Sequence, residues 1–195
     1  MTSEPLAGRL RSETADLHRK TETIVGVPGS VQTRQQYAQL LERLAVFYSS
    51  AQRAMEDERW HSGWQLVDID IASHSRISLL RSDLKQLGAP EPGGGQSVVP
   101  IDSFGAALGC LYVVEGSSLG GLSIGPAIRA TLGSVPTSFY DGAGRGHPRA
   151  WRRVQAALAA YDLGHPDVED VITGAELAFV RFGEIVGSSA GGLLQ

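Results

Sequence analysis

Cysteine is nearly absent from this chain, which has 195 residues and carries Cys110 alone. One thiol cannot form an intramolecular disulfide, and it excludes zinc clusters and cofactor attachments that need several cysteines. An excess of positive charge is also missing, because the formal net charge is -4, and this argues against a general nucleic-acid binder.

Long apolar runs are missing as well. No 18 consecutive apolar residues occur, so we expect no membrane span. The N-terminal stretch MTSEPLAGRLRSETADLHRK has no apolar segment of the kind found in signal peptides, so we expect a cytoplasmic protein. The glycine-rich stretch PGGGQ lacks the lysine of a phosphate-binding loop, and no GxGxxG follows a strand. We therefore expect no nucleotide site in this chain.

Helical periodicity is the main pattern that is present. Apolar residues recur at helical spacing in the segments 5–23, 33–59, 102–133, 151–161 and 168–185. Segment 68–88 begins with a strand-like alternation, but Ile77, Leu80 and Leu84 then follow helical spacing, so we expect a helix there too.

No convincing strand is found, and the sequence therefore predicts an all-α protein of roughly five to eight helices. The length predicts a single domain over residues 1–195, with a structured core of about 5–187.

The stretch Gly116–Gly121 carries three glycines in six residues. Each glycine inside a helix costs about 1 kcal/mol relative to alanine, so the cluster needs a physical reason. One interpretation is a helix that ends at a glycine cap and then restarts. Another is a kinked helix whose bare backbone at Gly116, Gly120 and Gly121 lets a flat ligand lie against it.

A third interpretation of the same stretch is hydrolase chemistry. GSSLG matches GxSxG with Ser118 as the nucleophile, and Asp141 and His147 follow in the chain order of such enzymes. That site requires a strand before the serine, for which only CLYVV is available. It also requires a parallel sheet, whereas the first 100 residues predict helices.

Three side chains of segment 5–23 share one helical face, namely Arg11, His18 and Glu22. His18 borders an apolar stripe, where it is either a half-buried histidine bonded to a neighbour or a neutral imidazole that ligates haem iron. In the second case Glu22 would orient the imidazole. Arg11, about 10 Å back along the axis, is then either a propionate partner or a solvated surface charge.

The segments LRSETADLHRKTE and LYVVEGSSLGG resemble the haem oxygenases, most closely the bacterial biliverdin-producing kind that is often paired with a bacterial phytochrome. The resemblance implies a proximal histidine on the first helix and a kinked distal helix, with haem between them. The residues that match these motifs are Arg11, His18 and Glu22 on the first helix and Gly116, Gly120 and Gly121 on the distal helix.

Two later segments resemble the same family more weakly. HPRAWRRVQAAL is similar to the helix whose basic residues meet the propionates, and Arg152 is its best match, with Arg153 next. AELAFVRFGEIV is similar to the last helix, on which Phe179 would close the pocket.

The resemblance implies an enzyme for which haem b, ligated by His18, is both cofactor and substrate. Such an enzyme uses O2 and external electrons to produce biliverdin, CO and ferrous iron. The electrons would come from a ferredoxin or reductase, and a bacterial phytochrome is a candidate acceptor of the biliverdin. The alternative is a carrier or sensor of the same fold that binds haem without turnover.

Ser117 departs from the pattern of many family members, which have an aspartate directly after the first distal glycine. The aspartate organises water near the bound oxygen, whereas a serine hydroxyl brings no charge. The resemblance thus implies a catalytic wall of Gly116, Ser117 and Gly120 and leaves proton delivery open. Glu115 lies about 100° around the helix from Gly116, so we do not expect it to replace the aspartate. We expect Tyr48 and His74 to have ordinary structural roles.

Overall fold

The computed structural model describes residues 4–90, 99–142, 147–165 and 168–187, and within these ranges the secondary structure is entirely helical. The α-helices are α1 Leu6–Glu13, α2 Ala15–Val25, α3 Arg34–Met55, α4 His61–Leu66, α5 Ile77–Gln86, α6 Phe104–Leu132, α7 Ser138–Asp141, α8 His147–Gly164 and α9 Glu169–Val186. Two short 3-10 helices, η1 Glu58–Trp60 and η2 Ile71–His74, flank α4 and precede α5. The all-α prediction is confirmed.

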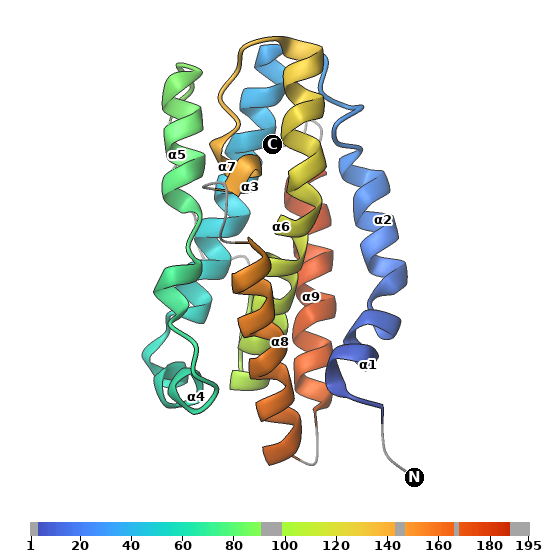
Figure 1. The fold of residues 1–195 in the computed structure, drawn as a ribbon, viewed down its shortest axis with the longest axis vertical. Coiled ribbons are helices and arrows are strands. Elements are labelled where there is room, and N and C mark those ends of the chain that lie inside the picture. Colours follow the sequence, from blue (N-terminus) through green and yellow to red (C-terminus); the bar gives the residue numbers. More distant parts are fainter. Residues whose placement is uncertain (1–3, 91–98, 143–146, 166–167, 188–195) are drawn as a thin grey trace, which may run out of the picture.

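The long helices run side by side, with α6 through the middle of the molecule (Figure 1). Helix α6 packs chiefly against α9, and α9 in turn packs against α2 and α3. Helices α1 and α2 lie along one side of the bundle and α5 along the other (Figure 1). No described helix is both long and apolar enough to cross a membrane.

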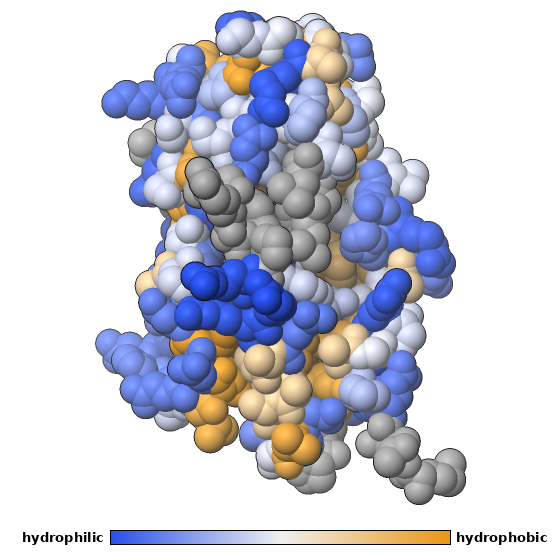
Figure 2. Space-filling view, in the orientation of Figure 1, coloured by the Kyte–Doolittle hydropathy of each residue, from blue (hydrophilic) through white to orange (hydrophobic). Residues whose placement is uncertain are grey.

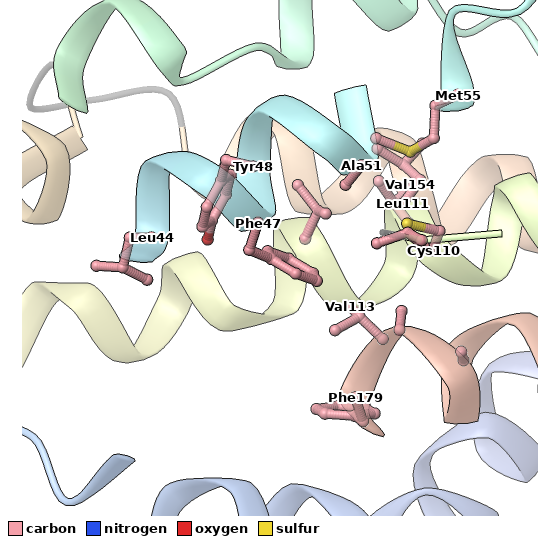
Figure 3. Close-up of a cluster of buried hydrophobic side chains, with 14 of the residues drawn as sticks. Leu44, Phe47, Tyr48, Ala51, Met55, Cys110, Leu111, Val113, Val154 and Phe179 are labelled. Carbon is pink, nitrogen blue, oxygen red and sulfur yellow. The ribbon is translucent and has the colours of Figure 1, made fainter. Parts of the chain in front are cut away.

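Helix α3 shows how local sequence sets these elements. Thr33 Oγ1 accepts from the Gln36 backbone N–H at 3.1 Å, and Gln36 Oε1 accepts from the Thr33 N–H at 3.0 Å. This reciprocal capping box satisfies donors that the first helical turn leaves free. The apolar stripe predicted for this helix is buried: Tyr37, Leu40, Leu41, Leu44, Phe47, Tyr48, Ala51 and Met55. Figure 3 shows several of these side chains directed toward α6 and α9.

The predicted helix over 5–23 is wrong in one respect, because it is divided at Thr14 into α1 and α2. The buried Thr14 hydroxyl donates to the Leu10 carbonyl at 2.6 Å, and the Thr14 backbone has φ -92° and ψ 0°. A threonine hydroxyl bonded to the carbonyl four residues back bends a helix. Arg11 and His18 therefore belong to two helices rather than to one straight face.

The prediction for 68–88 is also only partly correct, since the helix begins at Ile77 and η2 precedes it. Segment 102–133 in contrast forms one continuous helix, α6, which passes through the whole glycine stretch. The interpretation of a helix that ends at a glycine cap and restarts is therefore wrong.

Close packing of α6 on α9 depends on glycine. A Cβ on Gly109 would overlap the Val171 carbonyl oxygen, and one on Gly174 would lie 2.5 Å from the Ala106 carbonyl oxygen. Backbone atoms at such positions cannot turn aside as a flexible side chain can. These two glycines therefore set the distance between the helices.

The surface distributes its polarity unevenly. Figure 2 shows strongly hydrophilic side chains over the N-terminal half of α8 and along α2, and apolar ones near the end of the molecule where α4 lies. Arg152 and Arg153 are exposed on α8, and Leu66 and Leu163 are the most exposed large apolar residues described.

We expect Gly109→Ala to lower the free energy of unfolding by about 2 kcal/mol, because overpacking costs more than the gain in helix propensity. Chemical denaturation measures the change. Gly164→Ala is the matched control, since a Cβ there has nothing within 4 Å. Equal stability of both variants would contradict the packing described here.

Candidate functional site

Two adjoining cavities lie between α2, α6 and α9. The first, which we call the Tyr48 cavity, has a volume of about 220 Å³. The second, the Arg11 cavity, has a volume of about 660 Å³. Both are lined by His18, Val113, Ser117 and Phe179. The two cavities therefore meet where α2 faces α6.

His18 is half-exposed at this junction, with 50% of its side chain accessible. Its Nδ1 lies 3.7 Å from Glu22 Oε2, which is too long for a hydrogen bond but close enough for an electrostatic interaction. Its ring stands perpendicular to that of Phe179, with the ring centroids 5.6 Å apart. A carboxylate beside Nδ1 favours a proton there and leaves Nε2 available as a metal ligand.

Helix α9 holds α2, and with it His18, in place. Thr21 Oγ1 donates to the Phe179 carbonyl at 3.5 Å, and a Cβ on Gly183 would lie 3.7 Å from the same hydroxyl. At Gly187 a Cβ would overlap the Ile24 side chain. The Thr21 hydrogen bond and the small residue at Gly187, just after α9, therefore hold α2 against α9 on the side that brings His18 to the cavities.

Gly116 differs from the glycines that packing requires. A Cβ there would make only ordinary contacts, at 3.6 and 3.8 Å, with the Trp151 ring. Protein packing therefore leaves room for a methyl group at Gly116, which lines the Arg11 cavity together with His18. The missing Cβ widens the cavity at this point.

Most charged side chains of the cavity walls are exposed, and the exception is Arg76 of the Tyr48 cavity, whose side chain is 10% exposed. The Arg11 cavity carries Arg11 and Arg19, both exposed, and Arg19 forms an ion pair with Asp16. The Tyr48 cavity is largely apolar, with side chains such as Leu40, Leu44, Ile124, Phe139 and Phe182. An apolar interior with cations at the rim suits a flat apolar ligand that carries anionic groups.

Arg152 does not join this lining in the structure. It is exposed on α8, whereas its helix contributes Trp151, Gln155 and Leu158 to the described wall of the Arg11 cavity. Gly120 and Gly121 continue the α6 backbone, but their surroundings lie outside the part of the chain that the structure describes.

The hydrolase interpretation fails on the backbone. The segment CLYVV is helical, as is the rest of α6, so no strand leads to Ser118. The Ser118 and His147 side chains lie outside the description. The strand–turn–helix elbow that would activate a GxSxG serine is absent from this segment.

Sequence analysis missed two polar residues of the Tyr48 cavity, Tyr48 and Arg76. The Tyr48 hydroxyl lies 2.8 Å from Ser117 Oγ, and in Figure 3 it points toward α6. Burial raises the pKa of Tyr48, while the Arg76 charge and the Ser117 hydrogen bond act in the opposite direction. Tyr48 stood on a core stripe and Arg76 in an irregular segment, so neither pattern distinguished them.

A bare metal ion has no cage in the described residues, where no three His, Cys, Asp or Glu side chains are grouped for one. A single accessible imidazole instead suits a metal that a planar macrocycle already ligates. The apolar walls, the bare backbone at Gly116 and the cationic margin fit such a macrocycle.

Comparisons with known proteins agree with this chemistry. Residues 4–92 match the family model described as heme oxygenase. The chain is 32% identical to a heme oxygenase from Xanthomonas campestris over 152 residues, covering 75% of this chain and 86% of that protein. It is 28% identical over 184 residues to heme oxygenase PigA from Pseudomonas aeruginosa, covering 91% and 89% of the two chains.

A solved structure shares the fold. The heme oxygenase from Neisseria meningitidis, determined in NO- and CO-bound forms, superposes with a TM-score of 0.74 at 23% identity, covering 97% of this chain and 96% of that one. The extent of the match to the Xanthomonas protein, together with the family model over the first helices, leads to one assignment: this chain belongs to the haem oxygenase family.

Proposed function

We propose that this protein is a haem oxygenase, which opens the haem macrocycle with O2 and external electrons to give biliverdin, CO and Fe²⁺. The observation that carries the proposal is that His18 of α2 and Gly116 of α6 both line the Arg11 cavity. Membership of the haem oxygenase family supports the same chemistry. A carrier of the same fold remains the alternative, and turnover separates the two.

His18, Glu22 and Phe179 would hold the haem iron and orient its ligand. His18 would hold the iron of haem b through Nε2, and Glu22 would orient the ring from the Nδ1 side. Phe179 packs against the His18 ring edge-to-face and limits its rotation. Haem, when bound, supplies the iron that binds O2 and the porphyrin carbon that is oxidised.

Residues of α6, together with the arginines at the cavity rim, would position the macrocycle. Gly116, and by our proposal Gly120 and Gly121, would let the macrocycle approach the backbone, while Ser117 presents a hydroxyl. Arg11 would pair with a propionate at the cavity rim, and Arg152 would do so only after a change of its side-chain conformation. Such pairs fix how the macrocycle is rotated in its plane.

Electrons would come from a separate ferredoxin or reductase, because the sequence has no nucleotide fingerprint. Such donors are available in the cytoplasm, where we propose that the protein works. A bacterial phytochrome is a proposed acceptor of the biliverdin, on the resemblance alone.

Aerobic incubation of the purified protein with haem and a reductase tests the activity. We expect the Soret band to decline while the absorption of biliverdin grows, and chromatography with mass spectrometry identifies the isomer. A Soret band that persists through the incubation would show a carrier and overturn the enzymatic proposal.

We expect His18→Ala to abolish the imidazole-ligated spectrum of bound ferric haem, because it removes the proposed ligand. Electron paramagnetic resonance at low temperature measures this. His61→Ala is the matched control, because His61 is exposed on α4 away from both cavities. An unchanged spectrum for His18→Ala would show that another group ligates the iron.

We expect Gly116→Ala to weaken haem binding at least about tenfold, which corresponds to 1.4 kcal/mol, because the added methyl group occupies the face of the macrocycle. The free energy of unfolding of the haem-free protein should stay equal or rise slightly, since a Cβ finds only ordinary contacts and alanine favours a helix. Titration and denaturation give the two values. A loss of stability without a loss of affinity would assign Gly116 to packing instead.

A further inference from the structure

A buried ionic cluster borders the Tyr48 cavity through Arg76. Glu115 Oε1 lies 2.8 Å from His74 Nδ1, and both side chains are only 2% exposed. Glu115 Oε2 lies 3.7 Å from an Arg76 guanidinium nitrogen, and the Arg76 side chain is 10% exposed. We call these three residues the ionic cluster.

The three members of the ionic cluster come from three different parts of the fold. Glu115 is on α6 and is not part of the described lining of either cavity, whereas His74 ends η2 and Arg76 precedes α5. The Gln52 side chain on α3 donates to the Ile71 carbonyl at 3.2 Å and so anchors η2. Of the three residues, Arg76 is the one that the described wall of the Tyr48 cavity includes.

The Tyr48 and Ser117 hydroxyls line the same cavity as Arg76. Ser117 Oγ donates to the Val114 carbonyl at 2.9 Å. Because a serine hydroxyl has one proton, Tyr48 is then the donor in its 2.8 Å hydrogen bond with Ser117. The Ser117 proton can turn from the carbonyl to an acceptor in the cavity while the Tyr48 bond is kept.

Charge at Arg76 acts on this pair of hydroxyls. The positive charge opposes the effect of burial on the Tyr48 pKa, and the Glu115 charge adds to that effect. A guanidinium near the phenol therefore strengthens Tyr48 as a donor, and Tyr48 in turn strengthens Ser117, because hydrogen bonds in a chain polarise one another.

A purely structural explanation accounts poorly for the ionic cluster. Burying an ion pair costs desolvation energy that apolar residues of similar size would avoid. In this chain the cost is borne beside a cavity, with the cation at the wall and the carboxylate behind it. Charges fixed in advance near a reacting group stabilise developing charge of the opposite sign.

We propose that Arg76, held by Glu115 and His74, is a positioning residue that supplies positive charge to the oxygen-binding side of the cavity and polarises the Tyr48–Ser117 pair. The charge would act where Ser117 itself brings none. This inference rests on the proposed function, because it assumes that haem occupies the cavities.

Carbon monoxide bound to the ferrous haem complex is the probe. A positive potential at its oxygen end lowers the C–O stretching frequency, which infrared spectroscopy measures. We expect Arg76→Met to raise the frequency and Glu115→Gln to lower it, because the two changes remove charges of opposite sign. General damage to the fold would not produce opposite shifts.

Two further variants keep the test decisive where Arg76→Met does not fold. Arg76→Lys retains the charge and should stay closer to the frequency of the unmodified protein than Tyr48→Phe, which should raise it. Where Arg76→Met does fold, its effect should be smaller in the Tyr48→Phe background, as coupled residues require. Arg81→Met, at an exposed arginine on α5, is the control that should change nothing.

Turnover supplies a second measurement. We expect Arg76→Met to lower kcat at least about tenfold, or 1.4 kcal/mol of barrier, while its affinity for haem stays within about twofold. Shifts of equal sign in Arg76→Met and Glu115→Gln, or no shift in either, would overturn the inference and leave the proposed function standing. Failure of the unmodified protein to bind haem would overturn both.

Discussion

The contact between α6 and α9 is the constraint on which the rest of the structure depends. Gly109 and Gly174 let the two backbones meet where any side chain would overlap a neighbouring carbonyl. Helix α9 then carries α2 on its other side, where a Cβ on Gly187 would overlap the Ile24 side chain. The spacing of α6 and α9 is thus set by backbone contacts, whereas α2, which carries His18, meets α9 through the side chains of Thr21 and Ile24. The position of α2 relative to α6 therefore depends on α9, which contacts both.

Glycine has two distinct uses within α6. At Gly109 its purpose is helix packing, whereas at Gly116 packing leaves room for a methyl group. The sequence alone cannot distinguish the two positions, because a glycine at either one has the same free-energy cost within a helix. Only the neighbours of the missing Cβ separate a glycine that helix packing requires from one that borders a cavity.

Much of this could be predicted from the sequence, since periodicity is a local property. The helices over 33–59 and 168–185 followed from apolar spacing, and the segments around His18 and Gly116 carried the family resemblance. The break at Thr14 was not predictable, because a threonine hydroxyl bends a helix only when it bonds back to a carbonyl. The ionic cluster could not be predicted from the sequence for another reason. Glu115 in an apolar run signals a buried partner, but its partner His74 comes from a segment of irregular pattern 41 residues away.

Phe179 joins two parts of the site. Its ring meets the His18 ring edge-to-face, and its backbone carbonyl accepts from Thr21, on the same helix as His18. Phe179 also lines both cavities. A shift of α9 would therefore move the imidazole and the cavity walls together, so the two cannot be altered independently.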